Sequence, residues 1–218
     1  MAGGGGAPSE RVPELPPSMF HFVDAANADL VRRDGLLSTN AILQRGCFGV
    51  DVEDRARAHR PAGIVLPNGA YVRDQAPMPP TALATCLDAG LTPRDWYDLV
   101  NDHVFFWLSA ERVRRHRLAL RGRTQLLLTV DVKALAAAYA DRVYVTPFNI
   151  GNARRAPARR GRRTLTPVAS WRAHGWRAEA APGGRERASS HRPAELLVQQ
   201  GVPDIARFIT RVDRIDPE

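Results

Sequence analysis

Three side chains in this sequence have types and surroundings that suit chemistry better than packing. His21 lies inside an apolar run, Arg73 follows a candidate hairpin, and Glu195 opens the apolar run Leu-Leu-Val. A carboxylate that begins a buried strand is costly to desolvate unless a partner compensates its charge, and perturbed carboxylates gather at functional sites. Two plainer interpretations stay open. Glu195 can lie at a solvent edge or pair with one of the many arginines, and His21 can be a satisfied core histidine.

The elements that must position these residues are short and irregularly ordered. Alternating and apolar runs predict strands over residues 19–23, 103–108, 124–131 and 142–146, and another that begins at Glu195. Asn68-Gly69 lies between two apolar runs, which is the strongest short signal for a hairpin. Several strands follow one another with no helix between them. We therefore predict an α+β fold with a mostly antiparallel or split sheet and flanking helices.

Length and composition favour one domain. The chain has 218 residues, 44% of them hydrophobic, which is enough for a single core. We expect a disordered tail over residues 1–17, rich in Gly and Pro, and one domain over 18–218. Within it we expect a basic loop over 150–163. Residues 171–192 are poor in aliphatic side chains and are predicted to be a mobile insertion.

Several classes of protein are disfavoured by what the sequence lacks. No run approaches the roughly 20 apolar residues of a membrane span, and no apolar signal-peptide segment is present. Cys47 and Cys86 have no metal-ligand spacing, so we expect no metal and a reducing cytoplasm. The sequence has no Walker loop, G-x-G-x-x-G, G-x-S-x-G or H-E-x-x-H motif. We expect a monomer.

The positive charge is carried almost entirely by arginine. The net charge is +8 and Lys133 is the only lysine. Arginine-rich composition is also what a GC-rich genome produces, so bias alone is one explanation. Clustering favours a surface that contacts phosphates. The candidate nucleic-acid-binding residues in the two clusters are Arg112, Arg114, Arg115, Arg154, Arg155, Arg159 and Arg160.

Three motifs in chain order resemble the ADP-ribosyltransferase fold, and most of all the DarT-type DNA ADP-ribosyltransferase toxins. They are Phe20-His21-Phe22-Val23 with Asn27 and Gly35-Leu36-Leu37-Ser38, the strand Val104-Phe105-Phe106-Trp107-Leu108, and Ala194-Glu195-Leu196-Leu197-Val198 with Pro203. The sequence departs from the family where a threonine is Val23 and where a proline and a tyrosine are Phe105 and Trp107.

The resemblance implies a split antiparallel core, NAD as co-substrate, and catalysis by Glu195 with Arg73 and His21. Breaking the bond between nicotinamide and ribose develops a sugar cation, which a fixed carboxylate stabilises. By resemblance, the residues that bind the cofactor are His21, Asn27, Gly35, Leu36, Ser38, Phe106 and Trp107. Arg45 is the second choice for the family's arginine. For Arg73 we expect orientation of the acceptor and a charge that keeps Glu195 ionised.

The implied acceptor is single-stranded DNA or RNA, in a toxin or phage-defence role with a possible antitoxin or macrodomain-like hydrolase as partner. Three alternatives stay open. The acceptor can be a protein or a small molecule, the chain can be a nucleic-acid-binding module with a decayed NAD site, or it can be an RNA 2′-phosphotransferase of the same fold.

Overall fold

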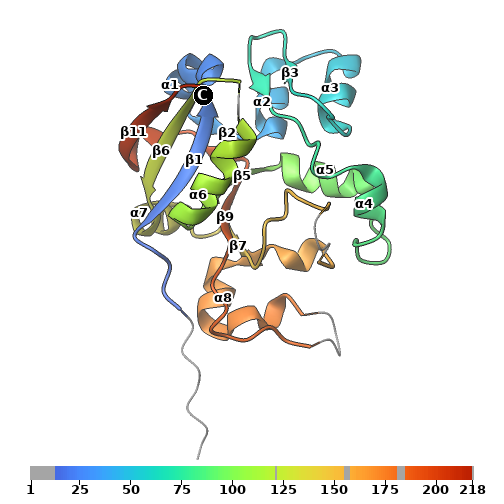
Figure 1. The fold of residues 1–218 in the computed structure, drawn as a ribbon, viewed down its shortest axis with the longest axis vertical. Helices are drawn as coiled ribbons and strands as arrows, with labels where there is room; N and C mark the ends of the chain where they lie inside the picture. The colour runs from blue at the N-terminus through green and yellow to red at the C-terminus, as the bar shows by residue number, and fades with distance from the viewer. Residues whose placement is uncertain (1–12, 121, 155–157, 181–184, 218) are drawn as a thin grey trace, which may run out of the picture.

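A seven-stranded antiparallel sheet forms the centre of the molecule, with strand order β11-β6-β1-β5-β9-β7-β8 (Figure 1). The computed structural model describes residues 13–120, 122–154, 158–180 and 185–217. The strands of this sheet are β1 (Ser18–Asp24), β5 (His103–Trp107), β6 (Gln125–Asp131), β7 (Val143–Thr146), β8 (Thr166–Pro167), β9 (Glu195–Gln199) and β11 (Ile209–Ile215). The mixed α+β class and the antiparallel sheet expected from the sequence are confirmed.

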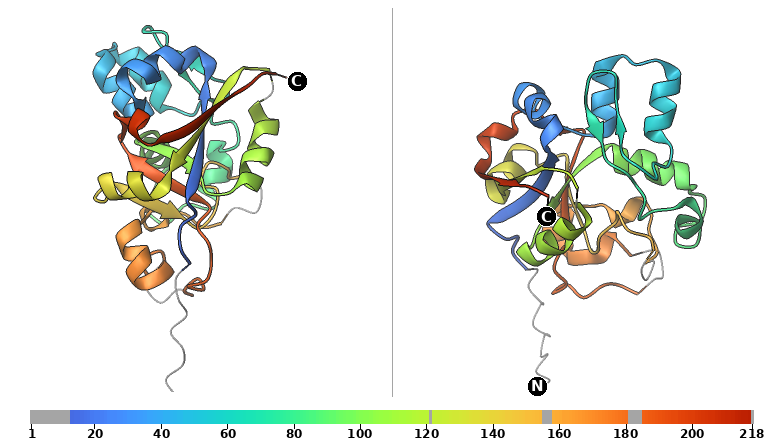
Figure 2. Two further views of the ribbon diagram at one scale, coloured as in Figure 1. Left: turned by 90° about the vertical axis from the view of Figure 1, so that its left-hand side faces the viewer. Right: turned by 45° about the horizontal axis from the view of Figure 1, so that its top comes forward.

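Two small sheets and eight α-helices complete the described part of the chain. One small sheet joins β2 (Leu36–Leu37) to β10 (Gly201–Val202), and the other is the hairpin of β3 (Ile64–Val65) and β4 (Tyr71–Val72). The helices are α1 (Ala28–Asp34), α2 (Thr39–Gly46), α3 (Val50–Arg57), α4 (Pro80–Ala84), α5 (Pro93–Asn101), α6 (Ala110–Arg117), α7 (Val132–Ala138) and α8 (Val168–His174). Figure 2 shows α8 at the end of the molecule away from α1, α2 and α3.

The sheet is weakly joined between β1 and β5. β1 pairs with β6 along its whole length, from Ser18 opposite Asp131 to Asp24 opposite Gln125. With β5 it shares only the pair Phe20 and Trp107. The backbone groups of both strands beyond this pair need other partners, which opens a position for side chains between the strands.

The main core lies on one face of the sheet, and its composition corrects one expectation. Met19, Phe106 and Leu196 point into this core and are fully buried. Trp171 of α8 and Trp176 of the following 3-10 turn (Gly175–Ala178) are buried there too. The expectation of a mobile insertion is therefore wrong for this first part, because two tryptophans anchor it where aliphatic residues are scarce.

Two further findings concern what the described residues lack. None of their helices combines the length and the apolar character that crossing a bilayer requires. The same residues contain no group of three or more His, Cys, Asp or Glu side chains placed to hold a metal. Residues 1–12, most of the expected tail, lie outside the described part.

Candidate functional site

Glu195 begins β9 at the middle of a row of side chains that cross the sheet. It lies opposite Trp107 of β5 and opposite Thr146 of β7. Residues directly opposite one another in an antiparallel pair point to the same face. Trp107, Glu195 and Thr146 therefore share one face, and only 3% of Glu195 is exposed.

The carboxylate of Glu195 is held by one of its two oxygens. Oε2 accepts hydrogen bonds from Thr146 Oγ1 at 2.9 Å and from the backbone N–H of Ile150 at 3.1 Å. Thr146 Oγ1 is also 3.0 Å from the carbonyl oxygen of Phe148. Because a hydroxyl has one proton to donate, Thr146 donates to only one of these two oxygens at a time. No described residue donates a hydrogen bond to Oε1. The side chain is thus oriented by the fold and keeps one oxygen for another donor.

Burial raises the pKa of Glu195 to about 7, because removing a carboxylate from water disfavours its charged form. The hydrogen bonds from Ile150 and Thr146 oppose this shift, as do the charges of Arg112 and Arg160. These two arginines, and not the expected Arg73, are the cations that act on Glu195. Near neutral pH the carboxyl therefore exchanges between protonated and ionised forms.

Arg160 fixes the loop that supplies the Ile150 amide. Its guanidinium donates to the carbonyls of Ile150 at 3.1 Å, Asn152 at 3.2 Å and Ala158 at 3.1 Å. The side chain is 2% exposed, so it cannot present its charge to a phosphate chain. The expectation of a nucleic-acid contact at Arg160 is wrong. Arg160 satisfies the buried carbonyls of its own loop, an arrangement that a basic run does not reveal.

His21 fills the position between β1 and β5 where ladder pairing stops. Its Nδ1–H donates to the carbonyl of Phe105 at 2.7 Å, and its ring lies 5.4 Å from that of Phe106. Burial, together with the charge of Arg73, lowers the pKa of His21 to about 4 and outweighs the opposing effect of the Phe105 hydrogen bond. The imidazole is neutral at pH 7, so Nε2 carries a lone pair and can accept a hydrogen bond.

Strand register places the side chains of His21 and Glu195 on opposite faces of the sheet. Phe20 shares the row of Trp107 and Glu195, and His21 follows it on the opposite pleat. The bond to a carbonyl of β5 draws the imidazole of His21 toward the gap between the strands. The register alone does not bring the two side chains together.

Arg73 is half-buried in a cluster with His116 and Gln125. It donates to His116 Nε2 and to Gln125 Oε1, both at 2.9 Å. The accepting His116 is neutral, because burial and Arg73 lower its pKa to about 4. No carboxylate of a described residue lies within 4 Å of the Arg73 guanidinium. Burial lowers the pKa of Arg73, while Asp74 opposes this. Arg45, the second choice, is exposed in the last turn of α2.

The two neighbouring aromatic residues of β5 have different surroundings. Phe106 is fully buried in the main core, so the expectation that it contacts a cofactor is wrong. Trp107 is half-buried on the face of Glu195, with its ring 5.2 Å from that of His116 in α6. Figure 1 shows α6 lying in front of this part of the sheet. Trp107 alone of the pair remains a candidate for stacking on a ligand.

Asn27 serves the fold by joining two segments that are distant in sequence. Its Nδ2 donates to the carbonyl of Tyr71 at 2.8 Å, and its Oδ1 accepts from the N–H of Tyr71 at 2.7 Å. The amide thus pairs with β4 as another strand would. Since both polar ends are occupied, a role in cofactor binding would require this bridge to break.

We expect Asn27→Ala to lower the free energy of unfolding by about 2 kcal/mol, because two hydrogen bonds to partly buried backbone groups are lost. Urea denaturation measures the change. Asn68→Ala removes one short-range turn bond to Ala70 N and is the control, with an expected loss of about 1 kcal/mol. Equal losses for the two variants would contradict the bridging role of Asn27.

The expected cofactor-binding loop Gly35-Leu36-Leu37-Ser38 is also occupied by contacts within the protein. Gly35 packs against the backbone of Pro203, and Leu36 pairs with Val202. Ser38 is buried, and its Oγ accepts from Ala41 N as the cap of α2. The first and last motifs of the sequence therefore meet each other, which the order of motifs alone did not indicate.

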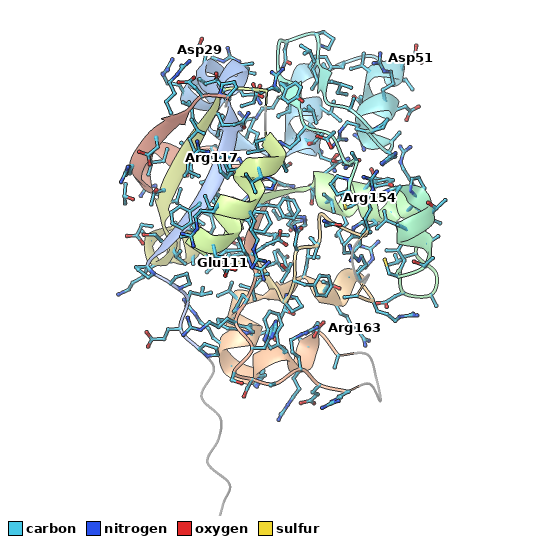
Figure 3. All side chains as sticks on the ribbon, viewed as in Figure 1. Asp29, Asp51, Glu111, Arg117, Arg154 and Arg163 are labelled. Atoms are coloured by element: carbon cyan, nitrogen blue, oxygen red, sulfur yellow. The ribbon has the colours of Figure 1, made fainter. Side chains whose placement is uncertain are left out.

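The arginine clusters lie on separate parts of the surface. Figure 3 places Arg117 on α6 and Arg163 beside α8. On α6, Arg112 is half-buried, Arg114 is exposed and Arg115 pairs with Glu111. Arg154 and Arg159 are exposed in the loop after β7, with Arg159 3.7 Å from Asp88. Arg155 lies outside the described residues.

Sequence reasoning missed the groups that hold Glu195 and Arg73. Thr146 and the Ile150 amide bond Glu195 across 49 and 45 residues, and His116 bonds Arg73 across 43. The only signal available was that Thr146 ends an apolar strand just before Pro147. A strand end does not say which neighbour its side chain will meet.

Comparison with known proteins identifies a family but no function. Residues 17–209 match the model of a family described as a family of unknown function, DUF7002. The comparisons with curated proteins and with solved structures found no match.

Proposed function

We propose that this chain, which belongs to the DUF7002 family of unknown function, is an NAD-dependent ADP-ribosyltransferase that modifies nucleic acid and releases nicotinamide. The proposal rests on the way in which the Glu195 carboxylate is buried and held. The carboxylate is buried, fixed through Oε2 by Thr146 and Ile150, and has no described donor at Oε1. A group oriented in this way suits a charge that develops in a transition state.

The transfer breaks the bond between ribose C1′ and the nicotinamide nitrogen, and the electron pair leaves with nicotinamide. An acceptor atom of a nucleobase then forms a bond to C1′ and loses its proton. Glu195, ionised, is proposed to accept a ribose hydroxyl at Oε1 and to stabilise the sugar cation. With a pKa near 7, the same carboxylate can also take up the acceptor's proton.

Other residues are proposed to orient the substrates. His21, whose imidazole is drawn toward the gap between β1 and β5, is proposed to accept a ribose hydroxyl at Nε2, because its proton is held at Nδ1 by Phe105. Trp107 shares the face of Glu195 and can stack on a flat ring. The single ladder pair between β1 and β5 supports the split sheet that the resemblance implies. Exposed arginines on α6 support a phosphate-bearing acceptor.

A binding module with a decayed NAD site is the second candidate. It is favoured by one observation, namely that Asn27, Gly35, Ser38 and Phe106 are all used by the fold itself. Calorimetry with NAD separates the two candidates, since the transferase must bind NAD and the module must not.

The direct test is incubation with labelled NAD and, separately, single-stranded DNA, single-stranded RNA and protein. We expect label on nucleic acid and release of nicotinamide with the natural chain, and both to fall by at least about a hundredfold with Glu195→Gln. Glu111→Gln is the control, because Glu111 is exposed on α6 and pairs only with Arg115 among the described residues. Absence of transfer to every acceptor would refute the proposal. Transfer to protein alone would leave the transferase and exclude the nucleic-acid acceptor.

A further inference from the structure

A group of arginines in the described residues lines a hollow remote in sequence from His21 and Arg73. The hollow has a volume of about 970 Å³, the upper end of the range for ligand pockets. Five arginines line it, and we name it the arginine groove. They are Arg159, Arg162, Arg163, Arg185 and Arg187.

One wall of the arginine groove is fixed by backbone hydrogen bonds. Arg160 N donates to Cys86 O at 2.8 Å, and Asp88 N donates to Arg160 O at 2.9 Å. Gly161 lies so close to Asp88 that an added Cβ would be 2.1 Å from its carboxylate. The 3-10 turn Arg162–Thr164 follows at once. It presents Arg162 and Arg163 from a rigid base.

The opposite wall follows Trp176, which is anchored in the core and donates to His191 O at 2.7 Å. Arg187 bonds both oxygens of Glu179, at 3.1 and 3.0 Å. Arg163 reaches across to the carbonyl of Ala180 at 3.3 Å. The described residues of both walls are therefore held by hydrogen bonds within the protein.

The acidic residues that line the groove already have partners. Asp88 is 3.7 Å from Arg159, Glu179 bonds Arg187, and Glu186 is 3.7 Å from Arg177. Arg162, Arg163 and Arg185 have no carboxylate of a described residue within 4 Å. These three guanidinium groups keep their charge for an external anion.

We propose that the arginine groove binds the phosphodiester backbone of a single-stranded nucleic acid. A guanidinium fork matches the geometry of a phosphate, and three such groups along an open groove match a chain of phosphates better than one ion. The described lining residues include no aromatic side chain, so bases cannot stack there and binding is independent of sequence.

The arginine groove adds an acceptor-binding site to the proposed function. Its identification as that site rests on the proposed function. Arg160 connects the two sites. Its backbone bonds that of Asp88, which lines the groove, while its guanidinium holds the Ile150 peptide that fixes Glu195. A strand bound in the groove would lie against the loop that orients the proposed catalytic carboxylate.

Fluorescence anisotropy with labelled single-stranded DNA and RNA tests the groove. The variant Arg162→Gln/Arg163→Gln/Arg185→Gln removes the three uncommitted charges. Arg207→Gln/Arg211→Gln/Arg214→Gln is the control and removes three exposed charges near the C-terminus. We expect the groove variant to bind at least about tenfold more weakly, with a salt slope reduced by about 2, since each phosphate contact on a single strand contributes about 0.7. The double variant Arg162→Gln/Arg185→Gln leaves the Arg163 bond intact in case the triple variant folds poorly.

Equal binding by the groove and control variants would overturn the inference, as would a strong preference for one base composition. Equal binding of DNA and RNA would identify their shared phosphodiester backbone as the ligand. Binding of only one of them would identify that nucleic acid as the acceptor. Release of nicotinamide from NAD without nucleic acid is measured in parallel and must be unchanged in the groove variant. If neither the natural chain nor the variants release nicotinamide, but the groove variant still loses nucleic-acid binding, the proposed transferase function is refuted and binding by the arginine groove is supported.

Discussion

Glu195→Gln is expected to reduce nicotinamide release by about a hundredfold to a thousandfold, while making the folded protein more stable at pH 8. The loss of activity follows from removing the fixed negative charge, which in comparable sites costs about 10² to 10³ in rate. The gain in stability follows from burial. An ionised carboxylate that is 3% exposed destabilises the folded state, and a neutral amide of nearly the same shape does not carry that cost.

The direction of the expected stability change follows from the raised pKa of Glu195. Glu195 has a pKa of about 7 in the folded protein, above its usual 4.5. Between these two values the folded state holds a proton that the unfolded chain has lost, so stability decreases as pH rises from about 4.5 to about 7. Above pH 7 the accumulated cost is on the order of 3 kcal/mol, at about 1.36 kcal/mol per unit. The amide that replaces the carboxyl in Glu195→Gln does not titrate, so this contribution vanishes in the variant.

Thermal unfolding of the natural chain and of Glu195→Gln at pH 5 and pH 8 measures the effect. Comparing the two proteins at each pH cancels the other titrating groups. The difference in stability should favour the variant at pH 8 and shrink at pH 5. Glu111→Gln, which changes an exposed carboxylate, should show no such pattern. A variant that is less stable than the natural chain at pH 8 would show that burial of the charged Glu195 does not destabilise the fold.

Gly35→Ala is expected to lower the free energy of unfolding by about 4 kcal/mol, since backbone strain and overpacking each cost roughly 1–3 kcal/mol. Gly35 has φ of 79° and ψ of −170°, a region that side chains avoid. An added Cβ would lie 2.1 Å from the carbonyl oxygen of Pro203. Because that contact is with backbone, no rotamer change relieves it.

Gly69→Ala is the matched control. Gly69 has φ of 84° but no atom within 4 Å of an added Cβ, so it isolates the conformational cost of about 1–2 kcal/mol. Urea denaturation of both variants gives the difference. Equal destabilisation would mean that the β2–β10 contact yields to the new methyl group, and that the two terminal motifs are not tightly joined.

Local features of the fold were predictable because they depend on neighbours in sequence. Thr92 caps α5 with Pro93 in the first turn and Asp95 completing a capping box, Ser38 caps α2, and Asn68-Gly69 closes the β3–β4 hairpin. Each of these is fixed by backbone geometry within a few residues. The first part of the expected insertion, around Trp171 and Trp176, was mispredicted for the complementary reason, since the burial of these two side chains depends on distant partners.

The sequence by itself determined the α+β class, the approximate positions of five strands of the main sheet and the choice of Glu195 as the unusual carboxylate. Only the tertiary structure decided what surrounds that carboxylate. Thr146, Ile150 and Arg160 reach it through strand register and loop packing, which are set by contacts between segments more than 30 residues apart. The same contacts buried Arg160 among carbonyls and left Arg162 and Arg163 outside. Which arginines of the run 160–163 are buried and which are exposed depends on where hydrogen bonds to distant segments hold the backbone. No local sequence pattern encodes that position.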